Sequence, residues 1–167
     1  NLSQNDLEQL PKNIDGLHSL KTLHLSGNKK LNFQHILFQL SAADSLEELN
    51  LVGCEMKELP SGILGLKSLK RLNLKENPLR SICKEIGSLS ALEELSLGIA
   101  LSNDKASIGK LPSEIGNCVS LRKMDLSLSG LEDIPESFSK LENLEYLDLS
   151  WNQLTVFPEA LSKLSRL

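Results

Sequence analysis

The sequence predicts an α/β fold: a right-handed solenoid of short repeats, with a parallel sheet on its concave face and short helical or 3₁₀ turns on its convex side. Three observations lead to this prediction. Leucines recur at a fixed spacing, that spacing returns about every 23 residues, and only 4% of the 167 residues are aromatic. An aliphatic core of this kind suits a stack of thin, nearly identical layers.

The repeat unit is clearest between Leu144 and Arg166. Leucines stand at its positions 1, 4 and 6, an asparagine at position 9, and apolar residues at positions 11 and 14: Leu144, Leu147, Leu149, Asn152, Leu154 and Phe157. This spacing resembles the L-x-x-L-x-L-x-x-N-x-L signature of a leucine-rich-repeat solenoid. Because side chains alternate along a strand, the leucines point inward, and only stacking against neighbouring repeats can bury them.

The same unit accounts for the whole chain, which we treat as a single domain, 1–167. The partial repeat is 1–19, and the full repeats are 20–45, 46–68, 69–91, 92–120, 121–143 and 144–166. Both ends fall inside a repeat. We therefore expect a fragment of a longer array, whose open leucine layers tend to associate end to end.

Each unit is expected to begin with a strand and to return through a helical turn. The x-L-x-L stretches predict strands near 22–25, 48–51, 71–74, 94–97, 123–126 and 146–149. Short helical or 3₁₀ turns should follow the prolines. Two units are longer than the rest: apolar spacing within 33–44 predicts a lengthened convex helix, and the small, polar segment 98–110 predicts a loop at one rim.

Position 9 carries small or amide side chains that should point inward. The residues there are Asn5, Asn28, Cys54, Asn77, Ala100, Ser129 and Asn152. An inward amide can bond turn backbone that would otherwise be buried without partners. Cys54 and Cys118 are predicted to be buried thiols, and Cys83, which replaces the usual proline, to be partly exposed. Three cysteines on separate repeats give no disulfide framework, which favours a reducing compartment.

Composition argues against several classes of partner and cofactor. The net charge is −4, from 18 basic and 22 acidic residues without a basic block, so no nucleic acid is expected. No apolar run reaches the length of a membrane span, so no membrane contact is expected. Metal, phosphate-loop and dinucleotide motifs are absent from the sequence, and we predict no cofactor. His24 and Ser26 share one face of a strand, but no third group orients them, and we predict no catalytic residue.

Charges alternate in sign on the expected concave face. Position 2 carries Lys21, Glu47, Lys70, Glu93, Arg122 and Glu145, and position 3 carries Thr22, Glu48, Arg71, Glu94, Lys123 and Tyr146. Neighbouring strands therefore present opposite charges side by side. A ladder that neutralises itself is the favoured interpretation over a surface that attracts a charged ligand.

The candidate binding residues cluster toward the C-terminal end. Position 8 becomes apolar in three successive repeats, at Ile99, Leu128 and Trp151, with Tyr146 nearby on the last strand. Asp125 and Asp148 occupy position 5 beside them. Aromatic anchors with a polar surround are typical of protein-binding hot spots. In the alternative interpretation, Trp151 packs along its neighbours or on a further repeat.

The returning arm L-P-x-x-I-G-x-L is seen as LPSEIGNCVSL at 111–121 and, from Cys83 in the place of the proline, as CKEIGSLSAL at 83–92. It resembles the intracellular leucine-rich repeats of Ras-pathway and Scribble-like scaffolds, plant intracellular repeat proteins and bacterial effectors. The resemblance implies a non-enzymatic, cytoplasmic module that binds a protein through its concave face and the 98–110 loop. The alternative is the ligand-sensing region of a plant-type immune receptor, or of a bacterial effector secreted into a host cytosol, with its catalytic domain elsewhere.

Overall fold

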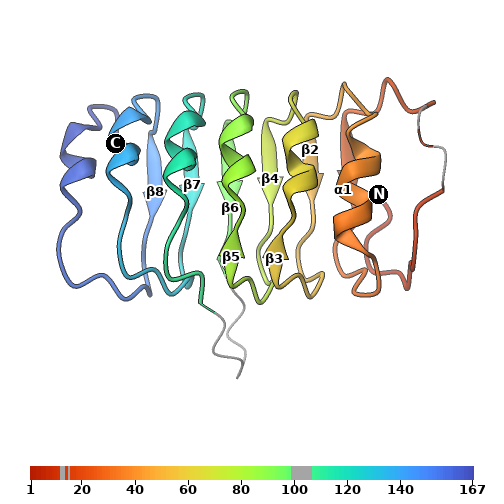
Figure 1. Cartoon of the computed structure of the whole chain (residues 1–167), viewed down its shortest axis with the longest axis horizontal. Helices are drawn as coiled ribbons and strands as arrows, with labels where there is room; N and C mark the ends of the chain where they lie inside the picture. The colour runs from red at the N-terminus through yellow and green to blue at the C-terminus, as the bar shows by residue number, and fades with distance from the viewer. Residues whose placement is uncertain (12–13, 15, 99–106) are drawn as a thin grey trace.

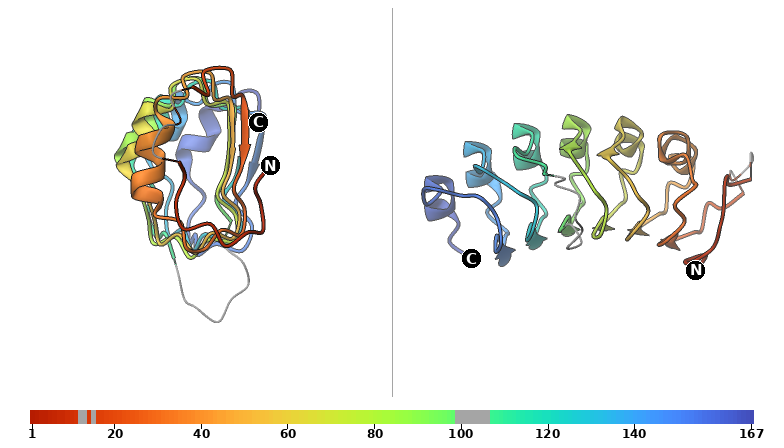
Figure 2. Two further views of the ribbon diagram at one scale, coloured as in Figure 1. Left: turned by 90° about the vertical axis from the view of Figure 1, so that its right-hand side faces the viewer. Right: turned by 90° about the horizontal axis from the view of Figure 1, so that it is seen from below.

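The computed structural model describes residues 1–11, 14, 16–98 and 107–167. The chain winds into a curved solenoid with strands on its concave face and helices on its convex face (Figures 1 and 2). One parallel sheet runs the length of the described solenoid in the order β1-β2-β4-β6-β7-β8. Its strands are β1 Thr22–His24, β2 Glu48–Asn50, β4 Arg71–Asn73, β6 Glu94–Ser96, β7 Lys123–Asp125 and β8 Tyr146–Asp148. The predicted right-handed solenoid with its concave sheet is confirmed.

Each strand ends one residue before the predicted boundary. The backbone pairing still continues into position 6, where Leu25 N donates to Asn50 O at 2.9 Å. Equivalent repeat positions pair in register, as in Leu23 with Leu49 and Leu49 with Leu72. This register stacks the inward leucines into one continuous buried core.

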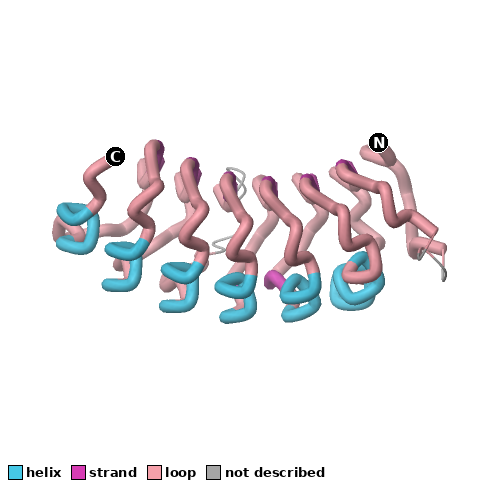
Figure 3. The backbone as a smooth tube through the Cα atoms, turned by 90° about the horizontal axis from the view of Figure 1, so that it is seen from above, coloured by secondary structure: helices cyan, strands magenta, loops and turns pink. Residues whose placement is uncertain are grey.

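In the described residues, the convex side carries one α-helix and a series of 3₁₀ helices (Figure 3). They are α1 Phe33–Leu40, η1 Ser61–Gly65, η2 Lys84–Ser88, η3 Ser113–Asn117, η4 Glu136–Lys140 and η5 Glu159–Lys163. The longer helix predicted within 33–44 is α1, capped by Asn32, whose side chain accepts from His35 N at 3.2 Å. It ends at Leu40, four residues before the end of the predicted segment.

The glycines of the I-G dipeptides allow adjacent convex turns to pack backbone against backbone. A Cβ at Gly87 would collide with the carbonyl oxygen of Glu114, and one at Gly116 with that of Ser137. A second, two-stranded parallel sheet, β3 Glu58–Leu59 with β5 Ser81–Ile82, lies in the returning arms. The sequence pattern does not predict this sheet, because two-residue strands are too short to show an alternation of apolar and polar residues.

Apolar side chains remain exposed at the outer layers of the stack. Leu2 and Leu17 are exposed in the first layer, and Val156 and Phe157 in the last. Within the described ranges, no helix is both long and apolar enough to cross a lipid bilayer.

Candidate functional site

The buried asparagines of position 9 tie each repeat to the one before it. Asn77 Oδ1 accepts from Cys54 N at 2.9 Å and from Met56 N at 3.0 Å. Its Nδ2 donates to Leu51 O and Leu74 O, both at 2.8 Å. Asn28 and Asn77 are fully buried, so these amides satisfy backbone groups that have no access to water. The expected inward orientation of position 9 is confirmed at both residues.

The predicted charge ladder on the concave face is also confirmed. Opposite charges pair between neighbouring repeats as Lys21–Glu47, Lys70–Glu47, Arg71–Glu48, Lys123–Glu94 and Arg122–Glu145. The pKa of Glu48 lies below its ordinary value because His24 and Arg71 hydrogen-bond its carboxylate. These side chains are mutually occupied, which supports self-neutralisation over ligand capture.

His24 and Ser26 bond to different partners. His24 Nε2 lies 2.9 Å from Glu48 Oε1, whereas Ser26 Oγ donates to Asn50 Oδ1 at 2.8 Å. Within the described ranges, no group of three or more His, Cys, Asp or Glu residues is arranged to hold a metal ion.

The three thiols lie in apolar surroundings. Cys54 and Cys118 are buried, as predicted, and Cys83 is half-buried. Burial raises the pKa of the Cys118 thiol to about 12 and, with help from the charge of Glu85, that of Cys83 to about 11. Such thiols are poor nucleophiles and poor metal ligands near neutral pH.

Four position 5 side chains close the turn that follows their own strand. Asn50 and Asn73 accept from the backbone N–H two residues on, at Val52 and Lys75, each at 3.1 Å. Asp125 and Asp148 do the same with Ser127 and Ser150, at 3.0 and 2.8 Å. The local sequence pattern Asn/Asp-x-x is a known turn former, and this structural role could have been read from it.

The two candidate aspartates differ in their surroundings. Asp125 also pairs with Lys75, whose Nζ lies 2.5 Å from Oδ2. Burial raises the pKa of Asp125, but hydrogen bonds from Lys75 and Ser127 outweigh it and hold the pKa below its ordinary value. Asp148 accepts a hydrogen bond from Ser150 N, and among the described residues it has no cationic partner. Asp125 therefore has an ion-pair partner in the free chain, whereas Asp148 has none among the described residues.

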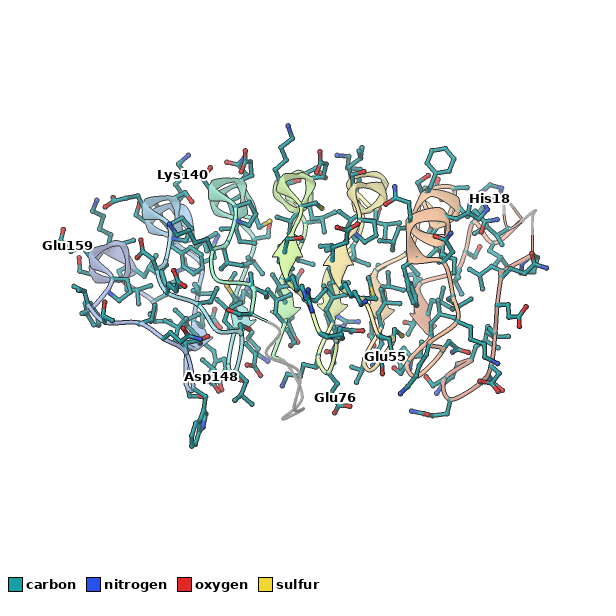
Figure 4. All side chains as sticks on the ribbon, turned by 60° about the horizontal axis from the view of Figure 1, so that its bottom comes forward. His18, Glu55, Glu76, Lys140, Asp148 and Glu159 are labelled. Carbon is teal, nitrogen blue, oxygen red and sulfur yellow. The ribbon has the colours of Figure 1, made fainter. Side chains whose placement is uncertain are left out.

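Position 8 lies at the edge of the solenoid where the strands end. Figure 4 shows Glu76, which occupies this position, and Asp148 along that edge, with Lys140 and Glu159 on the helical side. The chain has a single tryptophan, Trp151, and its side chain is 81% exposed. Leu128 is half-exposed, and Tyr146 is 53% exposed. Ile99 lies outside the described residues. We name Leu128, Tyr146, Asp148 and Trp151 the aromatic rim.

Three comparisons relate this chain to known proteins. A family model described as leucine rich repeat matches residues 116–167. A leucine-rich-repeat protein of Leptospira interrogans is 25% identical with a TM-score of 0.51, over 100% of this chain and 58% of that one. No curated protein matches the sequence. The chain has the leucine-rich-repeat fold.

Two further solved structures share this leucine-rich-repeat fold. The plant peptide hormone receptor RGFR1, solved in complex with RGF2, is 26% identical with a TM-score of 0.64, over 99% of this chain and 30% of that one. An internalin, inlF, of Listeria monocytogenes is 20% identical with a TM-score of 0.65, over 92% of this chain and 48% of that one. The chain thus spans 58% or less of the length of these three structures.

Sequence reasoning missed the backbone conformation of position 8 in this solenoid. Trp151, Leu128 and Glu76 have φ of 58°, 55° and 59°, in the left-handed region. Gly27 and Gly53 occupy the same position in two earlier repeats, with φ of 75° and 64°. Those two glycines were the available signal, because glycine adopts this conformation without strain. A bulky side chain there costs about 1–2 kcal/mol.

A groove of about 400 Å³ lies on the opposite, convex side, between α1 and η1. Phe38 and Leu64 line it, together with small and polar residues, and Phe38 is 71% exposed. Its lining includes no Asp, Glu, Lys or Arg. Phe38 therefore provides an exposed aromatic control on the face away from the aromatic rim.

Proposed function

We propose that this chain is a protein-interaction module that binds a partner protein through its concave face, with the aromatic rim as the contact centre. The observation that carries the proposal is Trp151, an indole that is 81% exposed on a left-handed backbone. Exposing a large apolar ring and placing it on a strained residue both lower the stability of the free chain. Contact with a partner protein would explain why the chain keeps both the exposed ring and the strained backbone.

The surroundings of Trp151 support a binding role. Tyr146 is also exposed, Leu128 precedes Trp151 in the same column, and Asp148 supplies a polar group on the adjoining strand. Aromatic anchors next to polar groups dominate the binding energy of many interfaces. The 98–110 segment belongs to this proposal as the second contact region, and most of it lies outside the described residues.

The comparisons add general support. RGFR1 has the same fold and was solved in complex with RGF2. We further propose that the module is non-enzymatic and cytoplasmic. His24 and Ser26, the residue types considered for catalysis, are bonded to separate partners. The free thiols of Cys54, Cys83 and Cys118 favour a reducing compartment.

A second candidate function is ligand sensing within a larger receptor or effector. The chain matches 30% of the peptide hormone receptor, so a similar segment can belong to a much longer protein. In that case the aromatic rim would bind the ligand, and any catalytic domain would lie outside this segment.

The test is a selection of peptides that bind the purified chain, taken from a displayed random library. Affinities of the recovered peptides are then measured for the unchanged chain and for Trp151→Ala and Phe38→Ala. We expect Trp151→Ala to weaken binding by about 2 kcal/mol or more, roughly 30-fold, as hot-spot aromatics do. Phe38→Ala should leave affinity unchanged.

Two checks separate binding from folding. Trp151→Asn places a residue type that tolerates a left-handed backbone at this position, so its unfolding midpoint should equal or exceed that of the unchanged chain while binding is lost. Lys21→Ala and Glu47→Ala, in the charge ladder at the other end, should change affinity little. Peptides that bind Trp151→Ala and the unchanged chain equally well would refute the aromatic rim as the contact centre.

A further inference from the structure

Asp148 breaks the charge pattern of the concave face. Along positions 2 and 3, neighbouring strands present opposite charges, but at position 5 Asp125 and Asp148 stand side by side in register. Like charges on adjacent strands repel. Lys75 neutralises Asp125, and within the described part of the chain no cation does the same for Asp148. The free chain therefore holds one uncompensated carboxylate on this face of β8.

The alternation also stops at Tyr146. Its position 3 predecessors alternate as Glu48, Arg71, Glu94 and Lys123, so the pattern would call for an acidic residue next. Lys123 pairs backward with Glu94, at 3.6 Å, and so is directed away from β8. An exposed phenol ring takes the place of a charge beside Asp148. With the exposed indole of Trp151, two aromatic rings lie close in sequence to the uncompensated carboxylate.

The net charge of the chain lies in its C-terminal repeats. Residues 113–167 contain nine acidic and five basic residues, a balance of −4. Residues 1–112 contain 13 of each, a balance of zero. A partner approaching the C-terminal repeats therefore meets a negative field, which favours a positively charged contact surface.

We propose that the partner protein inserts a basic side chain, foremost an arginine, between the exposed rings of the aromatic rim and the carboxylate of Asp148. This inference rests on the proposed function and specifies the chemistry of the partner. An arginine guanidinium stacks on aromatic faces and donates to a carboxylate at the same time. It would also offset the repulsion between Asp125 and Asp148.

The first test uses Trp151 as a built-in probe, because it is the only tryptophan of the chain. Tetra-arginine amide is titrated into the full chain while tryptophan emission is recorded, with tetra-citrulline amide as the uncharged counterpart. We expect tetra-arginine to give a saturable change in emission and tetra-citrulline to give none. Equal responses to the two peptides would overturn the inference.

The decisive variant is Asp148→Asn. Asparagine can still accept from Ser150 N, as Asn50 and Asn73 do in their own turns, so the fold should be retained. We expect tetra-arginine to bind this variant about tenfold more weakly, because the variant loses a charge-assisted contact with the peptide. Glu159→Gln on η5 removes one charge from the convex side and is the matched control. A similar loss in both variants would mean a general charge effect and would also overturn the inference.

The selected peptides distinguish this inference from the proposed function. Both the inference and the proposed function are supported if the binding of the peptides depends on Trp151, the peptides are enriched in arginine or lysine, and they bind Asp148→Asn more weakly. Peptides that depend on Trp151 but show neither basic enrichment nor a response to Asp148→Asn overturn only the basic partner. Peptides that do not depend on Trp151 overturn the proposed function itself.

Discussion

Lys75 reaches across a whole strand to pair with Asp125. Lys75 follows β4, Asp125 lies on β7, and β6 runs between them. The Nζ to Oδ2 distance is 2.5 Å. The small residues Ser96 and Gly98 occupy the intervening repeat, which leaves room for the lysine side chain to cross. This pair links three repeats and sets the charge environment next to the aromatic rim.

Replacing Lys75 by methionine should lower stability at neutral pH by about 1 kcal/mol or less, as for other part-exposed ion pairs. The native pKa of Asp125 lies below its ordinary value of 3.8. The stabilisation is therefore fully present above pH 3.8 and is lost as the pH falls through the native pKa. Urea unfolding across this range should show the two proteins converging in acid, while exposed Lys67→Met matches the unchanged chain throughout. A constant difference down to pH 2 would contradict this assignment.

Asn77→Ala should reduce the free energy of unfolding by about 1–3 kcal/mol, because it leaves buried backbone groups at Cys54, Met56, Leu51 and Leu74 without partners. Chemical denaturation measures the effect. Peptide binding should change only through the loss of folded protein. Unchanged stability would show that the buried amide bonds contribute nothing net.

The native thiols should resist alkylation. With a pKa of about 11 for Cys83 and about 12 for Cys118, roughly one thiol in a thousand or fewer is ionised at pH 8. Mass spectrometry after brief iodoacetamide treatment should find these cysteines unmodified in the native chain and modified in urea. Rapid native labelling of Cys118 would argue against its buried position.

The exposed outer layers predict weak end-to-end association of the 167-residue chain. Leu2 and Leu17 at one end and Val156 and Phe157 at the other present apolar surface. Sedimentation velocity should give a coefficient that rises with concentration, and Phe157→Glu should reduce this rise while Phe38→Glu does not. A monomer at every concentration, with terminal amides as protected as central ones, would count against the prediction.

Much of the fold can be predicted from the sequence because every repeat makes the same contacts with its neighbours. The strands, the leucine core, the inward asparagines and the neighbouring charge pairs all depend on residues one repeat apart, and a periodic template places these directly. Lys75 and Asp125 lie two repeats apart, so a comparison of adjacent repeats does not detect the pair. The same limit separated Asp125 from Asp148, which look equivalent in the sequence.

The aromatic rim was only partly predictable. Trp151, Leu128 and Tyr146 were identified because apolar residues at an expected surface position are unusual. The left-handed backbone of Trp151 and Leu128 was not predicted, because the glycine signal at Gly27 and Gly53 lies in repeats where the apolar column is absent. Ile99, the third member of that column, lies outside the described residues and stays a prediction.

The most direct test of the central proposal is the accessibility of Trp151 in the free and the ligand-bound chain, measured by acrylamide quenching of its fluorescence. No substitution is needed, since the chain contains one tryptophan. The free chain should be quenched readily, as expected for an 81% exposed indole. Saturation with a selected peptide should reduce the quenching constant several-fold, because the indole becomes buried in the interface. An unchanged quenching constant at saturation would show that the ligand binds elsewhere and would contradict the proposed site.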